Sequence, residues 1–397
     1  MSPTKLWNRN FTLLWIGQAQ SVCGNILYLV ALTYLVLNLT GSPKYTAITM
    51  AAGTIPYVLS PLVGVMIDRI NIKPYLVVGD LIRGMIMMLI CYLLWSNHLT
   101  VSVIIGSAFL TGLIGVIYRP TFGSILPRLV PNEDIARANA LNTLSGQIAN
   151  FAGFIFGGIL VAYIGILYAI LINGVTFVIM SILLGLIKFP EITENGNNAS
   201  VVEDLKAGFV YLFSSIPLLK IPFIFSAMGV SYAVLEMLMP VKLKSVNYGA
   251  EGFGILFSVL LIGSICSSSW ISKFGKYLDA NIYTPIGLVA MGVSIGGIAF
   301  SPSLKVACVF AFIYGIGSSL VSISSVTFIQ TNVEDRFRGR IFGLFGVIEQ
   351  ACMPIALLII GGLTDFISTE IILYLTSLFL LIISFFWIFG FKAEKIR

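Results

Sequence analysis

The chain has 397 residues, of which 58% are hydrophobic and only 10% are charged, and its mean hydropathy is +0.99. An ordinary soluble domain has about 25% charged residues, so this composition excludes a soluble protein and predicts one that folds in lipid. The net charge of +6 is not gathered into a basic run, which argues against a nucleic-acid partner. The chain has five cysteines: Cys23, Cys91, Cys266, Cys308 and Cys352. They lack the close spacing of metal or disulfide sites, so we expect no bound metal.

Apolar stretches recur along the whole chain. A helix that crosses a bilayer needs about 20 mostly apolar residues, because the lipid offers its backbone no hydrogen-bond partners. The first half supplies such stretches at residues 11–39, 45–66, 75–95, 101–118, 139–163 and 166–187. The second half supplies them at 221–239, 252–271, 282–299, 306–328, 341–363 and 371–391. The sequence predicts an all-α membrane protein with twelve transmembrane helices in two six-helix bundles.

Lysine and arginine are distributed unevenly between the loops. One alternate set of loops and termini contains 18 of these residues and the other set contains four. Because basic residues concentrate on the cytoplasmic side, we expect both termini in the cytoplasm and a multi-pass protein of the bacterial inner or plasma membrane.

A polar interval divides the chain near its middle. We expect an N-terminal bundle over 1–188, a cytoplasmic linker over 189–220 and a C-terminal bundle over 221–397. Apolar residues recur at helical spacing in the linker: Val201, Leu205, Phe209, Leu212 and Phe213. They predict a short amphipathic helix on the inner leaflet. A plain solvated linker is the alternative.

The two halves repeat each other. The run 132–134 before the fifth stretch corresponds to 333–335 before the eleventh, and the glycine pair 157–158 corresponds to 361–362. Parallel repeats of this kind place a substrate site between the halves near the bilayer midplane.

The loop after the second stretch contains Gly64, Asp68, Arg69 and Lys73 in that order. This pattern resembles the signature between helices 2 and 3 of the major facilitator superfamily. A helix N-terminus favours a carboxylate, so we expect Asp68 to latch the cytoplasmic side shut at the start of the eleventh helix, near Gly339 and Arg340. A generic charged turn is the alternative.

Further motifs resemble the macrolide-efflux branch of that superfamily, to which the enterobactin exporter is related. They are Asn10-Phe11 with 14–18, Asp80 to Arg83, Arg119-Pro120, 138–140, and 339–342 with Met353-Pro354. The resemblance implies twelve helices and proton-driven export of a drug, an antibiotic or a secreted metal chelator.

The fifth stretch is similar to the antiporter signature of the superfamily. Ala149, Gly153, Gly157 and Gly158 are small, while Phe154 stands in place of the usual proline. Small residues permit close helix packing and bending. The fourth stretch lacks the arginine of many drug antiporters, so proton coupling must use other groups.

Ionisable residues inside a bilayer are costly and are functional candidates by default. Asp80 and Arg83 lie three residues apart and can pair, which leaves open whether Arg83 is structural or touches an anionic substrate group. Glu349 and Glu236 lie in the second half. A buried carboxylate without a fixed partner favours its neutral form, which suits a proton carrier. Glu349, Glu236 and Asp80 are the candidates for proton coupling.

Polar side chains at the depth of the cavity are the candidates for substrate contact. They are Asn25, Tyr28, Tyr34, Gln147, Asn150, Tyr232 and Gln350. Together with Arg83 they suit a zwitterionic or chelating metabolite as well as a cationic drug.

Other classes of protein are disfavoured. The chain has no phosphate-binding loop of an ATP-driven pump, and its sole histidine, His98, has no partner at catalytic or metal-ligand spacing, so we expect no enzyme and no cofactor except the proton gradient. The sequence predicts a monomeric secondary active exporter of a small amphipathic or zwitterionic molecule, with proton-coupled uptake of a metabolite as the alternative.

Overall fold

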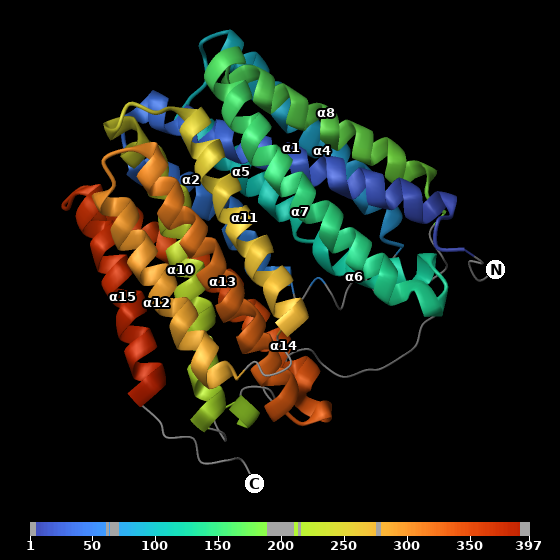
Figure 1. Cartoon of the computed structure of the whole chain (residues 1–397). Helices are drawn as coiled ribbons and strands as arrows, with labels where there is room; N and C mark the ends of the chain where they lie inside the picture. The colour runs from blue at the N-terminus through green and yellow to red at the C-terminus, as the bar shows by residue number, and fades with distance from the viewer. Residues whose placement is uncertain are drawn as a thin grey trace. The chain divides into compact units, whose positions relative to one another are not determined.

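A computed structural model describes residues 5–60, 63, 71–188, 210–212, 216–274 and 279–389, and their regular elements are all helical (Figure 1). The first half contains α1 (Arg9–Thr40), α2 (Pro43–Thr54) with a 3₁₀ turn (Ile55–Leu59), α4 (Lys73–Trp95), α5 (Val101–Gly115), α6 (Tyr118–Leu129), α7 (Ile135–Ile159) with a π turn (Leu160–Ile164), and α8 (Ile166–Leu186). The second half contains α10 (Ile216–Ser245), α11 (Ala250–Phe274), α12 (Ala280–Phe300), α13 (Leu304–Asn332), α14 (Asp335–Leu363) and α15 (Thr369–Phe389).

The described residues contain 11 helical spans that are long and apolar enough to cross a membrane. They coincide with predicted stretches, apart from the second one. That stretch is helical from Pro43 to Ser60, and most of the rest of it lies outside the described residues. The all-α membrane fold predicted from the sequence is confirmed.

The chain forms two compact units. The first comprises Met1–Tyr45 and Ala52–Asn198, and the second comprises Thr46–Ala51 and Ala199–Arg397. Most of the predicted linker lies outside the described residues, but α10 already begins at Ile216.

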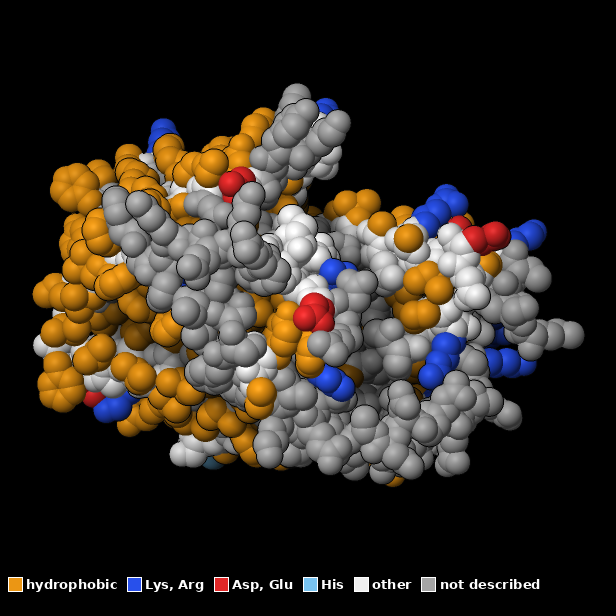
Figure 2. Space-filling model, turned by 90° about the horizontal axis from the view of Figure 1, so that it is seen from below, with side chains coloured by type: hydrophobic (Ala, Val, Ile, Leu, Met, Phe, Trp, Pro, Cys, Tyr) orange, Lys and Arg blue, Asp and Glu red, His pale blue; other side chains and the backbone are white. Residues whose placement is uncertain are grey.

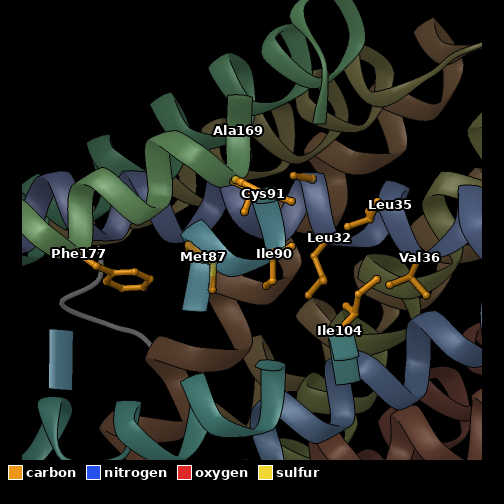
Figure 3. Packing of buried hydrophobic residues seen from close by; sticks show 11 residues of the cluster. Leu32, Leu35, Val36, Met87, Ile90, Cys91, Ile104, Ala169 and Phe177 are labelled. Carbon is orange, nitrogen blue, oxygen red and sulfur yellow. The ribbon is translucent and has the colours of Figure 1, made fainter. Parts of the chain in front are cut away.

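The core of the first unit is built by α1, α4, α5 and α8. Leu32 and Leu35 of α1 meet Met87 and Ile90 of α4, and Phe177 comes from α8 (Figure 3). The helices approach closely where they lack side chains: a Cβ atom on Gly84 would lie 3.3 Å from the Gly174 carbonyl oxygen. The Ser181 hydroxyl also donates to the Val77 carbonyl oxygen at 2.8 Å. These contacts fix the rotation of α4, and therefore the face on which Asp80 and Arg83 lie.

A break in the fourth apolar stretch separates α5 from α6. Pro120 has no amide hydrogen to continue the helix, and its ring crowds the carbonyl group four residues earlier. The first helix therefore ends at Gly115, and the second starts at Tyr118 with the proline in its first turn. The break directs the Tyr118 and Phe122 side chains to the cavity described below.

Glycines of α7 pack directly on α1, as the small residues of this helix predict. A Cβ atom at Gly153 would lie 3.1 Å from the Cys23 carbonyl oxygen, and one at Gly157 would lie 3.3 Å from the Leu27 Cα atom. Helix α7 is thus held close to the part of α1 that lines the cavity.

The second unit is organised around α13, which packs against α11 and α12, while α10 packs against α14 and α15. Leu212 was expected in a helix on the lipid surface. Its side chain is instead 2% exposed and packs in a cluster with Ile221 and Phe345. The Tyr211 ring stacks on Phe337 with 4.3 Å between centroids. This short described segment packs against protein, and the rest of the predicted linker helix lies outside the described residues.

The outer surface is largely apolar. Figure 2 shows hydrophobic side chains over broad areas, with basic and acidic groups confined to a few places. Among the exposed large hydrophobic side chains, Phe366 is 84% and Trp95 is 74% accessible. Such a surface is stable against lipid chains and would aggregate in water.

The close approach of α5 to the segment around Gly53 can be tested. We expect Gly112→Ala to destabilise the protein by about 1–3 kcal/mol, because the new methyl group would overlap the Gly53 carbonyl group and lie 3.3 Å from its Cα atom. Gly106→Ala in the same helix is the matched control, since nothing lies within 4 Å of its Cβ position. Thermal unfolding in detergent measures both, and equal melting temperatures would contradict the packing.

Candidate functional site

A cavity of about 280 Å³ lies inside the first unit. Helices α1, α4, α6, α7 and α8 and the 3₁₀ turn after α2 all contribute to its wall. Its apolar side is made by Val22, Phe122 and Met180 together with the Tyr57 ring. Its polar side chains are Gln18, Ser21, Asn25, Asp80, Arg83, Tyr118, Asn142 and Ser145.

Asp80 and Arg83 form an ion pair in the wall of this cavity, as their spacing predicts. The distance from Arg83 Nη1 to Asp80 Oδ1 is 3.3 Å, and the two residues are 7% and 0% exposed. The guanidinium carbon lies 3.9 Å from the centroid of the Phe177 ring and 5.2 Å from that of Tyr118. Stacking on aromatic faces stabilises a cation that has left water.

The surroundings of the pair are rigid. The Tyr118 hydroxyl donates to the Leu76 carbonyl oxygen at 2.9 Å, which ties the start of α6 to α4. A Cβ atom at Gly79 would lie 2.9 Å from Ile114 Cγ2 and 3.1 Å from the same hydroxyl oxygen, so a larger residue would crowd this contact. The position of Arg83 is therefore set by both neighbouring helices.

Several polar atoms at the cavity have no hydrogen-bond partner among the described residues. They are Gln18 Oε1, Asp80 Oδ2 and Arg83 Nε, and all three are buried. The buried Tyr28 hydroxyl also has no hydrogen-bond partner among the described residues, and it is close enough to Arg83 for an electrostatic interaction. A buried polar group without a partner costs about 1–3 kcal/mol. Such a group in a cavity wall is suited to bind a polar ligand.

The other candidates of the first unit are not all brought to the cavity. Asn25 lines it, whereas Tyr34 is buried in α1 at 8% exposure and Asn150 is half-buried outside the lining. Gln147 is exposed, because it lies on a different face of α7 from Ser145. Tyr34, Gln147 and Asn150 therefore do not line this cavity, and their contact with substrate stays a prediction.

In the second unit, the two candidate glutamates differ. The Glu236 side chain is 3% exposed, and no ion pair or hydrogen bond of its carboxylate is found within the described part of the chain. Glu349 is exposed on α14, and its role in proton coupling stays a prediction. Gln350 is half-buried. The Tyr232 ring contacts the Phe257 ring edge-on, with 6.0 Å between the ring centroids.

The predicted latch is only partly visible. Gly64, Asp68 and Arg69 lie outside the described residues. The Lys73 ammonium group donates to the Gly185 and Ile187 carbonyl oxygens at 2.7 and 2.8 Å, where a cation stabilises the C-terminus of α8.

The α14 side of the latch is described. Gly339 lies in the second turn of α14, and the Arg340 guanidinium lies 5.6 Å from the centroid of the Phe337 ring. The latch itself remains a prediction.

Sequence reasoning missed several residues of the cavity. Gln18, Tyr118 and Asn142 were not among the candidates, although each presents a polar group to it. The signal for Tyr118 was the proline two residues later, which ends α5 and turns the chain inward. No comparable local signal marks Asn142.

Comparison with solved structures identifies the fold. The nucleoside transporter NupG aligns with a TM-score of 0.79 over 96% of this chain and 99% of its own, at 14% identity. A bacterial homologue of the iron transporter ferroportin aligns with a TM-score of 0.75 over 96% of this chain and 99% of its own, at 17% identity. The helical spans and this likeness define a multi-pass, all-α membrane fold that the chain shares with these transporters.

Sequence comparison gives the family. The transmembrane secretion effector family matches residues 2–395, and the chain belongs to it. Macrolide efflux protein A of Streptococcus pyogenes is 21% identical over 92% of this chain and 91% of its own length. The putative bacilysin exporter BacE of Bacillus subtilis is 23% identical over 94% of this chain and 93% of its own length. The resemblance to an efflux branch of the superfamily, seen in the sequence, is confirmed.

Proposed function

We propose that this protein is a secondary active exporter, which moves a small amphipathic or zwitterionic molecule out of the cytoplasm by alternating access in exchange for protons. The observation that carries the proposal is the buried Asp80–Arg83 pair in a cavity wall, with polar atoms that have no hydrogen-bond partner among the described residues. Membership of a secretion family, with relatives named for efflux of a macrolide and export of bacilysin, supports the direction.

The cavity suits a substrate because it combines charge with apolar surface. Small-molecule sites are mostly apolar pockets of about 300–1,000 Å³ in which a few polar groups fix orientation. Here Asp80 and Arg83 supply the charges, while Phe122 and Met180 supply apolar contact. Ionisable groups inside a bilayer commonly mark a substrate or ion pathway.

Proton exchange requires a carboxylate that alternates between its charged and neutral forms. Asp80 meets the cavity, and its charge is balanced by Arg83 only when that pair is intact. Glu236 is a second carboxylate, in the other unit, that is buried without an ion pair among the described residues. We assign proton coupling to one or both, in a monomer with both termini in the cytoplasm. Proton-coupled uptake is the alternative.

Transport in inverted membrane vesicles tests the direction. Vesicles containing this chain, acidified inside, are expected to accumulate a labelled compound that the chain exports from cells, from a panel of macrolides, cationic dyes and small zwitterions. Accumulation should stop when the pH gradient is collapsed with an ionophore. Accumulation only in right-side-out vesicles with an acidic exterior would indicate uptake and contradict the proposal.

A further inference from the structure

We infer that the cavity of the first unit binds a compact zwitterion, with the cationic group of the ligand at Asp80 and its anionic group at Arg83. The inference rests on the proposed function and names the chemical class of substrate at the same site.

Charge balance is the first argument. The ion pair is neutral as a whole, and both members are more than nine-tenths buried. A ligand with a single positive charge that bound Asp80 would leave Arg83 uncompensated, and a single negative charge at Arg83 would do the same to Asp80. An uncompensated buried charge is strongly unfavourable. A ligand with both charges can bind each member without leaving a net charge in the wall.

Unused hydrogen-bonding capacity is the second argument. Asp80 Oδ2 and Gln18 Oε1 are acceptors without a donor among the described residues, whereas Arg83 Nε is a donor without an acceptor. A ligand that satisfies all three must supply donors as well as an acceptor. An ammonium group has three donors and a carboxylate has only acceptors, so an amino-acid-like pair of groups meets both needs.

The arginine is already in position for such a ligand. Phe177 and Tyr118 hold the guanidinium plane, and Nη1 is occupied by Asp80 at 3.3 Å. Little side-chain freedom is left to lose when an anionic group arrives, which favours binding.

The size of the cavity limits the ligand. Its volume of about 280 Å³ is just below the usual range for small-molecule sites. Tyr57 and Phe122 provide aromatic surface in its lining. A small zwitterion with one apolar or aromatic substituent matches these dimensions.

Three probes of nearly equal size separate the possibilities: phenylalanine, N-acetylphenylalanine and phenylalaninamide. Phenylalanine carries both charges, the acetyl derivative only the negative one and the amide only the positive one. Binding to the purified full-length chain is measured by its thermal stabilisation over a range of probe concentrations. Phenylalanine is expected to bind about tenfold or more tightly than either derivative, because each derivative leaves one buried charge without its partner.

Variants assign each charge to its residue. Asp80→Asn should remove the preference for phenylalanine over N-acetylphenylalanine, and Arg83→Gln should remove the preference over phenylalaninamide. If a single variant fails to fold, the charge-neutral double variant Asp80→Asn/Arg83→Gln decides, and it should bind the three probes alike. Glu133→Gln, at an exposed position between α6 and α7, should bind the three probes with the same order of affinity as the wild-type protein.

The outcomes separate this inference from the function on which it rests. Equal or absent binding of the three probes, or tightest binding of phenylalaninamide, overturns the zwitterion. Tightest binding of N-acetylphenylalanine, increasing as the pH falls, would indicate an anion taken up with a proton on Asp80 and would overturn it too. Continued gradient-driven export in the vesicle assay would leave the transport function standing in each case.

Discussion

Arg83→Ala is expected to abolish transport and to destabilise the protein by about 3–5 kcal/mol. The substitution removes the partner of Asp80, a residue that is 0% exposed, and leaves its carboxylate without a counter-charge. It also removes the cation that stacks on Phe177 at 3.9 Å. Vesicle transport measures the first effect, and thermal or denaturant unfolding measures the second.

Two companion variants distinguish a transport role from a structural one. Arg83→Lys keeps the charge but loses the planar group that stacks on Phe177. We therefore expect a stability between those of Arg83→Ala and the wild-type protein, and transport at least about tenfold slower than wild type. Asp80→Asn/Arg83→Gln removes both charges, and replacement of a whole buried pair is often neutral or stabilising. We therefore expect the double variant to recover stability without recovering transport. Wild-type transport by the double variant would mean that the pair only holds α4 in place.

The membrane fold could be predicted from the sequence because one physical constraint dominates it. A bilayer forces each crossing segment to satisfy its own backbone, so the predicted stretches 166–187 and 306–328 correspond to α8 and α13. Boundaries shift where a proline intervenes. The predicted helix 101–118 ends as α5 at Gly115 because of Pro120, and α6 then continues to Leu129.

The candidate site was predictable only where the signal was local. Asp80 and Arg83 lie three residues apart on one helix, which places them on one face, and their pairing followed from that spacing. The sequence could not place Gln147 and Glu349 in this way, because the face of a polar residue in an apolar helix depends on the rotation of that helix. Rotation is set by packing against other helices, as by Gly153 against α1, and an apolar sequence on all sides does not encode it.

Glu236→Gln is expected to uncouple transport from the proton gradient. The Glu236 side chain is 3% exposed, and Tyr232 on its own helix is close enough for an electrostatic interaction with it. Tyr232 also interacts with Tyr314 of α13, whose hydroxyl lies 2.8 Å from that of Ser231. The nearest described ion pair on α10 is Lys242 with Glu370 of α15, at 3.9 Å. A carboxylate in this setting is stable when protonated and costly when charged, as a proton carrier requires.

Glutamine imitates the protonated side chain and cannot release its proton. We expect this variant to exchange labelled for unlabelled substrate across the membrane at close to the wild-type rate, while accumulation driven by a pH gradient falls at least about tenfold. Glu370→Gln is the matched control, because its side chain is 42% exposed and its contact with Lys242 is long, at 3.9 Å.

The two readouts also identify other outcomes. Loss of exchange together with a lowered melting temperature would mean that Glu236 supports the packing of α10, and gradient-driven accumulation unchanged by the substitution would remove it from proton transfer. In that second case Asp80 is the remaining buried carboxylate among the candidates, and its exchange between Arg83 and a proton would then couple the gradient to substrate binding in the same cavity.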